Sequence, residues 1–391
     1  MIMKAEIDYH DILAGAEALK GEICALRAEF HRHPEPGNRE FKTASRIEAD
    51  LDLLGIPHRR LTETGVLARL DGAQPGRVIA LRADMDALPV HEATGAPFSS
   101  QEEGYMHACG HDVHVTALLG AARLLIKARE GMRGSVVFIF QPDEESDGGA
   151  ERMIAAGALD DVDEVYGAHV APDLPEGHMG VRYGKFYAAS DVFRVKVTGR
   201  SSHGAVREKG VDALDAACAM ARKLLTLPRL DPEEPSVVTV GMMHAGTAVN
   251  ILPGEATFAG IIRTLGRDKR LKMSELFENT LRDIAAKHGV GLDVNLKHGY
   301  SGIVNHARQT EYVRRAAARL LGEGAVHEIE APTMVSEDFG YYLDERPGSF
   351  YHIGAGCTSP LHAPDFLPTE KALVTAAAVH AAVVLSRQND E

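Results

Sequence analysis

The sequence predicts an α/β protein in which a ferredoxin-like (βαββαβ) domain interrupts a larger domain with a mostly parallel sheet and helices. Three observations lead to this prediction. Short apolar runs alternate with helical segments through residues 1–187, the order changes to β-α-β-β-α-β over residues 188–298, and helix–strand alternation returns over residues 299–391. A chain of 391 residues is also longer than one ordinary core requires, which favours two domains.

The first segment alternates helices with short apolar strands. Apolar residues at helical spacing predict helices over 12–30, 41–54 and 113–128. Runs rich in Val, Ile and Phe predict buried strands over 77–82 (RVIALR) and 135–140 (SVVFIF), on either side of the third helix. Strand–helix–strand order of this kind favours a parallel sheet.

The inserted segment shows a different pattern. Phe193, Val195 and Val197 alternate with polar residues, which predicts a half-exposed strand and a sheet with one open face. The elements that we expect after it are a helix over 211–227, strands over 236–243 and 256–263, a helix over 268–288 and a strand over 292–296. After the insertion, the chain ends in an Ala- and Val-rich helix from Thr369.

Charge and apolar content restrict the partners. A formal net charge of −14 argues against nucleic-acid binding, which needs a basic surface. The apolar stretch 373–385 is too short to span a bilayer and contains His380, and the N-terminal segment lacks the apolar core of a signal peptide. We therefore expect a cytoplasmic protein with a small-molecule substrate and no membrane partner. Its four scattered cysteines are expected to be free thiols.

Two segments outside the insertion combine acids, a thiol and imidazoles. RADMDALP (82–89) brings Asp84 and Asp86 just past a predicted strand, where open α/β sheets place their ligands, although solvated loop acids give the same pattern. HACGHD (107–112) sets Cys109 and His111 two residues apart before a helix, an arrangement that can hold one metal or bridge two. The nearby His107 and His114 are expected to pack or support the loop.

Two further segments supply carboxylates and histidines. QPDEES (141–146) directly follows the strand SVVFIF, and its adjacent Glu144 and Glu145 point different ways, so one can bind metal while the other transfers protons. His169 lies near a predicted strand end in GAHV, and His362 lies in SPLHAP. One thiolate, several imidazoles and carboxylates together suit a zinc- or manganese-type site.

Eight blocks, in order along nearly the whole chain, resemble the metal-dependent amidohydrolase family of hippurate hydrolase, bacterial N-acyl-amino-acid deacylases (aminoacylases) and auxin-conjugate hydrolases. The blocks are RADMDALPV, HACGHDVH, QPDEES, GAHV, SSHGA, GTAVNILPGEATFAGIIRT, SEDF and LHAP. The resemblance implies a catalytic metal-binding domain, 1–187 with 299–391, interrupted by a dimerisation or lid domain, 188–298. It also implies a homodimer, or a tetramer built from dimers.

The resemblance also implies residue roles. Two divalent ions, zinc or manganese with cobalt or nickel as further options, would be bound by Cys109 as the bridging ligand and by His111, Glu145, His169 and His362. Glu144 matches the general base, and Asp86 matches an acid that orients the metal site. In the insertion, His203 matches an oxyanion-stabilising residue that reaches the other subunit's site. Asn250 and Arg263 match groups that hold the substrate carboxylate.

Some blocks depart from the usual family pattern. QPDEES replaces QPAEEG, so Asp143 adds charge beside Glu144 and Ser146 replaces a glycine, while Ala168 in GAHV replaces a larger residue. The expected ligands are intact, so the departures bear on substrate preference. The implied reaction is hydrolysis of an N-acyl amino acid to a carboxylic acid and a free amino acid, with Glu144 moving the proton and His203 stabilising the oxyanion.

Three alternatives remain at this point. The same dinuclear site could serve a dipeptidase or an N-carbamoyl-amino-acid hydrolase. A non-catalytic binding protein could retain the fold, although it would be expected to lose Glu144 or a ligand. A cysteine hydrolase could use Cys109 with His111, and its activity would survive a chelator.

Overall fold

The computed structural model describes residues 8–230 and 234–389. They divide into two compact units. The first comprises Met1–Gly184, Asn305–Glu330 and Tyr341–Glu391, and the second comprises Lys185–Val304 and Ala331–Gly340. The second unit contains the whole of the predicted insertion, extends beyond it at both ends and adds a short segment from later in the chain.

The first unit is built on a mixed sheet with the strand order β1-β2-β4-β3-β5-β16-β6-β15. Its central strands β4, β3, β5 and β16 are parallel, but β1 with β2, β2 with β4 and β16 with β6 are antiparallel. The bounds are β1 (His58–Leu61), β2 (Gly65–Asp71), β3 (Gln74–Asp84), β4 (Arg133–Gln141), β5 (Glu164–Ala171), β6 (Met179–Val181), β15 (Val326–Glu328) and β16 (Gly348–Gly354).

At the far edge, β15 is parallel to β6. The sheet is therefore mixed: the predicted parallel pairing holds at the centre and for β15 with β6, and it is wrong for β1, β2 and the β16–β6 pair. Only residues 62–64 separate β1 from β2, and so short a connection permits only an antiparallel hairpin. That hairpin was missed because HRRL, the sequence of β1, offers no apolar run.

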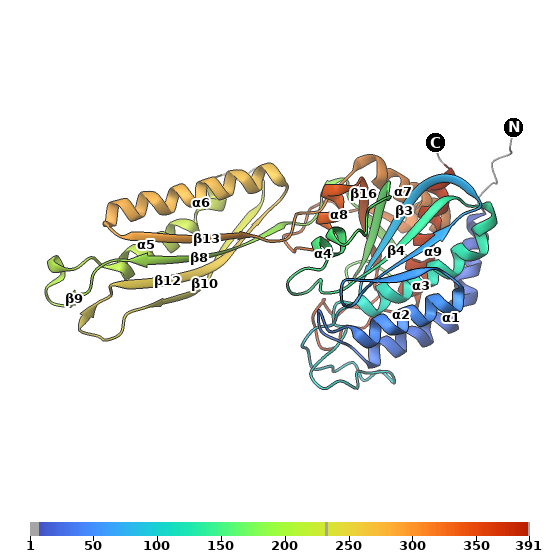
Figure 1. The fold of residues 1–391 in the computed structure, drawn as a ribbon, viewed down its shortest axis with the longest axis horizontal. Helices are drawn as coiled ribbons and strands as arrows, with labels where there is room; N and C mark the ends of the chain where they lie inside the picture. Colours follow the sequence, from blue (N-terminus) through green and yellow to red (C-terminus); the bar gives the residue numbers. More distant parts are fainter. Residues whose placement is uncertain (1–7, 231–233, 390–391) are drawn as a thin grey trace. The chain divides into compact units, whose positions relative to one another are not determined.

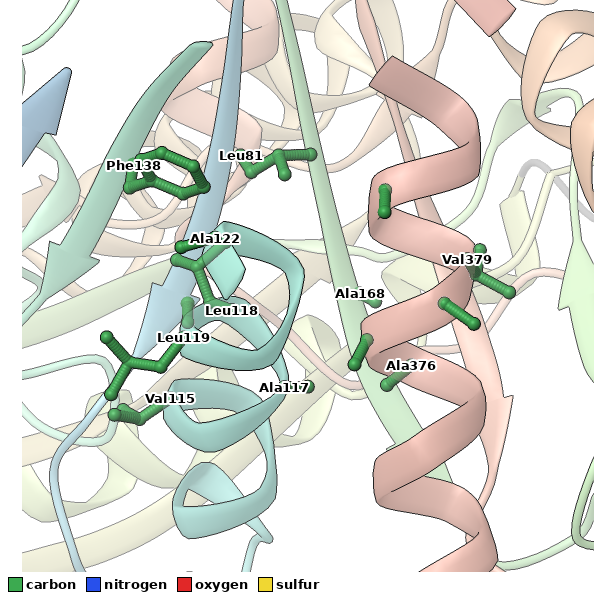
Figure 2. Close-up of a cluster of buried hydrophobic side chains, with 14 of the residues drawn as sticks. Leu81, Val115, Ala117, Leu118, Leu119, Ala122, Phe138, Ala168, Ala376 and Val379 are labelled. Atoms are coloured by element: carbon green, nitrogen blue, oxygen red, sulfur yellow. The ribbon is translucent and has the colours of Figure 1, made fainter. Parts of the chain in front are cut away.

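One hydrophobic core joins the sheet of the first unit to five of its helices. α3 is buried along nearly its whole length, and most of its residues are apolar. Figure 2 shows α3 and α9 side by side against the strands that carry Leu81, Phe138 and Ala168. A Cβ on Gly120 would lie 3.0 Å from the Cβ of Ala377, so glycine permits this close helix contact. The five helices are α1 (Tyr9–Arg32), α2 (Phe41–Leu54), α3 (His111–Ala128), α7 (Ala307–Leu321) and α9 (Glu370–Asn389).

Shorter elements complete the description. They are α4 (Ala150–Ala155), α8 (Gly340–Glu345), and β7 (Gly184–Lys185), which pairs with β14 (Val304–Asn305). Among the helices in the described part of the chain, none has both the length and the apolar character needed to cross a bilayer.

The second unit has a four-stranded sheet of order β10-β12-β8-β13, in which all neighbouring strands are antiparallel. α5 and α6 lie on one face of this sheet (Figure 1) and share a core with Phe193 and Phe258. A small pair, β9 (Ser202–His203) with β11 (Ile251–Leu252), lies outside the sheet. The remaining bounds are β8 (Ala189–Thr198), α5 (Ala213–Leu224), β10 (Ser236–Ala245), β12 (Glu255–Thr264), α6 (Arg267–His288) and β13 (Gly291–His298).

Candidate metal centre

The five expected ligands converge within the first unit, although they are far apart in the sequence. The Sγ atom of Cys109 lies 3.3 Å from the Nε2 atoms of both His169 and His362. Several groups of three possible ligands have their ligand atoms within 4.8 Å of one another, and two of these groups share Cys109. These groups are Cys109–His111–His169 and Cys109–Glu145–His362.

Backbone geometry sets the thiol beside β5. Gly110 precedes α3 with φ of 88°, in the left-handed region where glycine carries no steric penalty. A Cβ at this position would come 2.5 Å from Cγ2 of Val170. Because only glycine allows this approach, Cys109 can lie next to His169, which is inside β5 rather than at its end.

The hydrogen bonds of two histidines fix which ring nitrogen can bind a cation. Nδ1 of His111 lies 2.8 Å from the carbonyl oxygen of Asp86, and Nδ1 of His169 lies 2.8 Å from that of Val170. A carbonyl can only accept, so each Nδ1 donates and each Nε2 can present its lone pair to the cluster.

His114 has no nitrogen left for a metal. Its Nε2 accepts the backbone N–H of Val170 at 3.0 Å, so its Nδ1 donates to Oδ1 of Asp84 at 2.6 Å. The expectation that His114 supports the loop agrees with this geometry. Asp84, which sequence reasoning left among loop acids, is fully buried, and its other oxygen accepts from Arg82 at 2.5 Å. The sequence feature that could have indicated burial of Asp84 is its position directly after the apolar run RVIALR, because β3 extends to this residue.

Two buried atoms test whether this site suits a metal. Nε2 of His111 and Oε1 of Glu145 lie 3.9 Å apart, and neither has a hydrogen-bond partner among the residues that the structure describes. Buried polar atoms are normally paired, and a divalent cation would satisfy both. The donor set of thiolate, imidazole and carboxylate therefore fits a metal ion.

The electrostatics agree with that fit. Burial raises the pKa of the Cys109 thiol well above its usual value, and Glu145 and Glu144 raise it further. Burial alone would lower the pKa of His111, but Asp84, Asp86 and Glu145 raise it to about 10. Burial and the carboxylates thus disfavour a thiolate, and the carboxylates favour positive charge in the same place, so a cation bound there would favour ionisation of Cys109.

Asp86 organises the loop that carries the two glutamates. Its Oδ1 accepts the backbone N–H of Glu144 at 3.1 Å, and its Oδ2 accepts that of Glu145 at 3.0 Å. Burial would raise the pKa of Asp86, but His111 and the Glu145 N–H keep it below its usual value. Asp86 is therefore a fully ionised acceptor beneath both glutamates.

The other expected site residues belong to the second unit. His203 lies in the two-residue strand β9, where it pairs with Ile251 of β11. This pairing brings Asn250 beside it, because the N–H of Gly204 donates to the Asn250 carbonyl at 2.8 Å. The side chains of His203 and Asn250 are both exposed.

Arg263 lies within β12 in the same unit. Its Nη1 atom is buried without a hydrogen-bond partner among the described residues, and burial lowers its pKa. A buried, unpaired guanidinium nitrogen is suited to bind an anion.

Comparison with known proteins identifies the family. The model of Peptidase family M20/M25/M40 matches residues 80–386. The chain belongs to this family. The resemblance inferred from the sequence blocks is therefore confirmed, and this M20-family chain is similar to characterised hydrolases along most of its length.

Two curated relatives and one solved structure illustrate the similarity. An N-acyl-L-amino acid amidohydrolase of Geobacillus stearothermophilus is 39% identical over 294 residues, 74% of this chain and 80% of the relative. Thermostable carboxypeptidase 1 of Saccharolobus solfataricus is 33% identical over 379 residues, 94% of this chain and 95% of the relative. The YXEP protein of Bacillus subtilis, described as a dinuclear metal binding peptidase, superposes with a TM-score of 0.86 at 32% identity, covering 95% of this chain and 99% of that one.

Proposed function

We propose that this M20-family chain hydrolyses the amide bond of N-acyl amino acids and releases a carboxylic acid and a free amino acid. The observation that carries the proposal is the pair of ligand groups that share Cys109, with Glu144 next to the ligand Glu145. The amidohydrolase relative supports the substrate class, and the dinuclear YXEP structure supports two divalent ions. The thiolate favours zinc, and manganese is the second candidate.

The residues that would hold the ions are Cys109, His111, Glu145, His169 and His362. Bound there, the ions would polarise the scissile carbonyl and acidify the attacking water. Glu144 is the proton carrier in this proposal: it takes a proton from the attacking water and gives it to the leaving nitrogen. The Asp86 contact with its N–H holds the backbone of Glu144 in place during both transfers. Cys109 is a poor nucleophile because its pKa is raised.

We assign the second unit as a ferredoxin-like dimerisation or lid domain. In chain order its strands are arranged 4-1-3-2, the order of that fold, and both helices cover one face. His203 and Asn250 lie beside residues that a monomer leaves in solvent, since Val249 is fully exposed and Ile251 is 42% exposed. Exposed apolar residues next to functional groups suit a two-fold contact with a second subunit.

A peptide or N-carbamoyl substrate is the second candidate, and the carboxypeptidase relative favours the peptide. The test measures kcat/KM for a panel of N-acetyl, N-benzoyl and N-carbamoyl amino acids and dipeptides, with zinc or manganese added. We expect an N-acyl amino acid to be the best substrate. A dipeptide or N-carbamoyl compound that exceeds every N-acyl compound about tenfold would replace the proposal, because that ratio corresponds to ~1.4 kcal/mol of transition-state preference.

The unpaired Nη1 of Arg263 predicts that the substrate needs a free α-carboxylate. Converting a good substrate to its methyl ester removes the charge that the guanidinium would bind, so kcat/KM should fall by about ten- to a hundredfold. Arg263→Lys is the matched control and should narrow the gap between acid and ester, since lysine cannot form the forked pair of bonds. Equal kcat/KM for acid and ester in the unaltered protein would remove Arg263 from the site.

The exposed position of His203 predicts catalysis across a dimer. His203→Ala and Glu144→Gln should each be inactive alone. Mixed under subunit exchange, they should recover activity to about a quarter of that of the unaltered protein, because roughly half the dimers are mixed and each has one intact site. The measurement is turnover after exchange has been verified with differently tagged chains.

The control for this experiment mixes His203→Ala with Asn250→Ala, two changes in the same unit. If His203 and Asn250 serve the same neighbouring site, no mixed dimer has a complete site, and activity should stay low. Proven exchange without recovery in the first mixture would mean that His203 acts within its own chain or has no catalytic part.

A further inference from the structure

The residue before Glu144 is held in an unusual way. Asp143 has φ of 60°, in the left-handed region that costs a non-glycine residue energy, and its side chain is 0% exposed. A buried carboxylate needs partners for its charge. Its Oδ2 accepts from Nη2 of Arg152 at 2.6 Å, and its Oδ1 accepts from the hydroxyl of Ser146.

Arg152 connects this carboxylate to two other segments. It lies on α4, and its Nη1 donates to Oδ1 of Asn38 at 2.5 Å while its Nε donates to the carbonyl of Gly148 at 3.3 Å. The guanidinium therefore holds both ends of the loop 143–148 and ties them to residue 38. We call this set of Arg152 contacts, with Asp143, Gly148 and Asn38, the clamp. About half of the Arg152 side chain is exposed, so Arg152 lies between the buried Asp143 carboxylate and solvent.

The segment before α2 is shaped to receive the Asp143 side chain. A Cβ at Gly37 would lie 2.2 Å from Oδ1 of Asp143, so this position must stay glycine while the carboxylate is there. The same segment is joined to the Asp86 loop, since the N–H of Ala87 donates to the Glu35 carbonyl at 2.9 Å. The segment 35–38 therefore contacts both the loop that carries Asp86 and the loop that carries Glu144 and Glu145.

The glutamates lie between two sets of fixed contacts. On one side, the N–H of Asp143 donates to Oε1 of the buried Glu40 at 2.9 Å. On the other, the N–H groups of Glu144 and Glu145 donate to Asp86. If Asp143 left its left-handed conformation, the next peptide would turn and the glutamates would lose their register with Asp86.

We propose that Asp143, clamped by Arg152 and Ser146, is a positioning residue that fixes Glu144 for proton transfer and Glu145 for metal binding. The inference rests on the proposed function for the first of these effects. The second can be measured without any substrate. The clamp is thus expected to control both turnover and metal affinity through the backbone of one loop.

The central variant is Arg152→Met, which leaves the buried carboxylate of Asp143 without its cation. We expect kcat to fall by about ten- to a hundredfold, with KM changed less than about twofold, because Glu144 is misplaced and substrate contacts are untouched. Zn²⁺ affinity, measured by competition with a chromogenic chelator, should fall by about tenfold or more. Arg152→Lys keeps the charge and should show a smaller loss in both quantities.

A double-mutant cycle separates positioning from general damage. Asp143→Ala removes the other partner of the same ion pair, so it should also lower kcat and Zn²⁺ affinity, and adding Arg152→Met to it should lower either quantity by no more than about threefold further. Arg59→Met, at an exposed arginine on β1, is the matched control and should change neither quantity.

Two results would overturn the proposal. One is an Arg152→Met protein that melts at a lower temperature but keeps its kcat and Zn²⁺ affinity, which would make the clamp purely structural. The other is a double variant whose losses in kcat and Zn²⁺ affinity are the product of the two single losses, which would mean that Asp143 and Arg152 act independently. If the unaltered protein turns over no N-acyl amino acid, the proposed function fails, while the Zn²⁺ measurements still decide whether the clamp positions Glu145.

Discussion

Replacing Glu144 with glutamine should lower kcat by about 10²–10⁴-fold and leave the bound metal in place. Glutamine keeps the size of the side chain and its backbone N–H contact with Asp86, but it cannot take a proton from water. Loss of a positioned general base typically lowers the rate of a reaction by this factor. The measurement is kcat with the best N-acyl amino acid, together with metal content per subunit by elemental analysis.

Glu145→Gln is the matched control, because it makes the same chemical change one residue away. The buried Oε1 of Glu145 has no hydrogen-bond partner among the described residues and lies 3.9 Å from Nε2 of His111 and 3.3 Å from Nε2 of His362, so the amide variant should bind less metal. Added metal should restore part of its turnover. If Glu144→Gln keeps more than about a tenth of the unaltered rate, the base must be a different group.

Removal of divalent metal should abolish turnover, and returning zinc or manganese should restore it. Nε2 of His111 and Oε1 of Glu145 have no hydrogen-bond partner among the residues that the structure describes, and burial together with the nearby carboxylates raises the pKa of the Cys109 thiol. A bound cation would offset both costs. After dialysis against a chelator, kcat should therefore fall below about a hundredth of its value in the untreated protein, because the metal ions would no longer polarise the carbonyl or acidify the water.

The same experiment decides between metal and cysteine catalysis. A hydrolase that used Cys109 as nucleophile would retain its rate in the chelator and lose it to an alkylating reagent. Cys218, which is exposed on α5, would also react with the alkylating reagent, so the alkylation is carried out on a Cys218→Ser protein. This variant should respond to chelator and to metal as the unaltered protein does. Full turnover in verified metal-free protein would reject the proposed metal chemistry.

The fold was predictable where the sequence pattern is local. The apolar runs RVIALR and SVVFIF gave β3 and β4 within a few residues, and α2 was predicted at its observed bounds. β16 was not predicted, because its place between β5 and β6 depends on pairing with strands that lie far earlier in the chain. The spacing of apolar residues indicates whether a segment is buried, but it does not indicate which strands the segment pairs with.

For the site, residue type and order along the chain indicated the ligands, and the resemblance supplied their roles. Sequence reasoning indicated a supporting role for His114 but not its partners, which are Asp84 and the backbone of Val170. It missed the contact of Arg152 with Asn38, because 114 positions separate the two residues. The left-handed φ of Asp143 decides where its carboxylate points, and no residue pattern indicates such a conformation at an aspartate.

The position of β16 has a consequence for synthesis on the ribosome. β16 pairs with β5 on one side and β6 on the other, yet it is made after residues 185–304 of the second unit. Until it emerges, β5 has an open edge with free N–H and C=O groups, which are prone to pair with other chains. The second unit takes only ten later residues, 331–340, so most of it can form first. The sheet of the first unit can be completed only after residues 348–354 of β16 have been made.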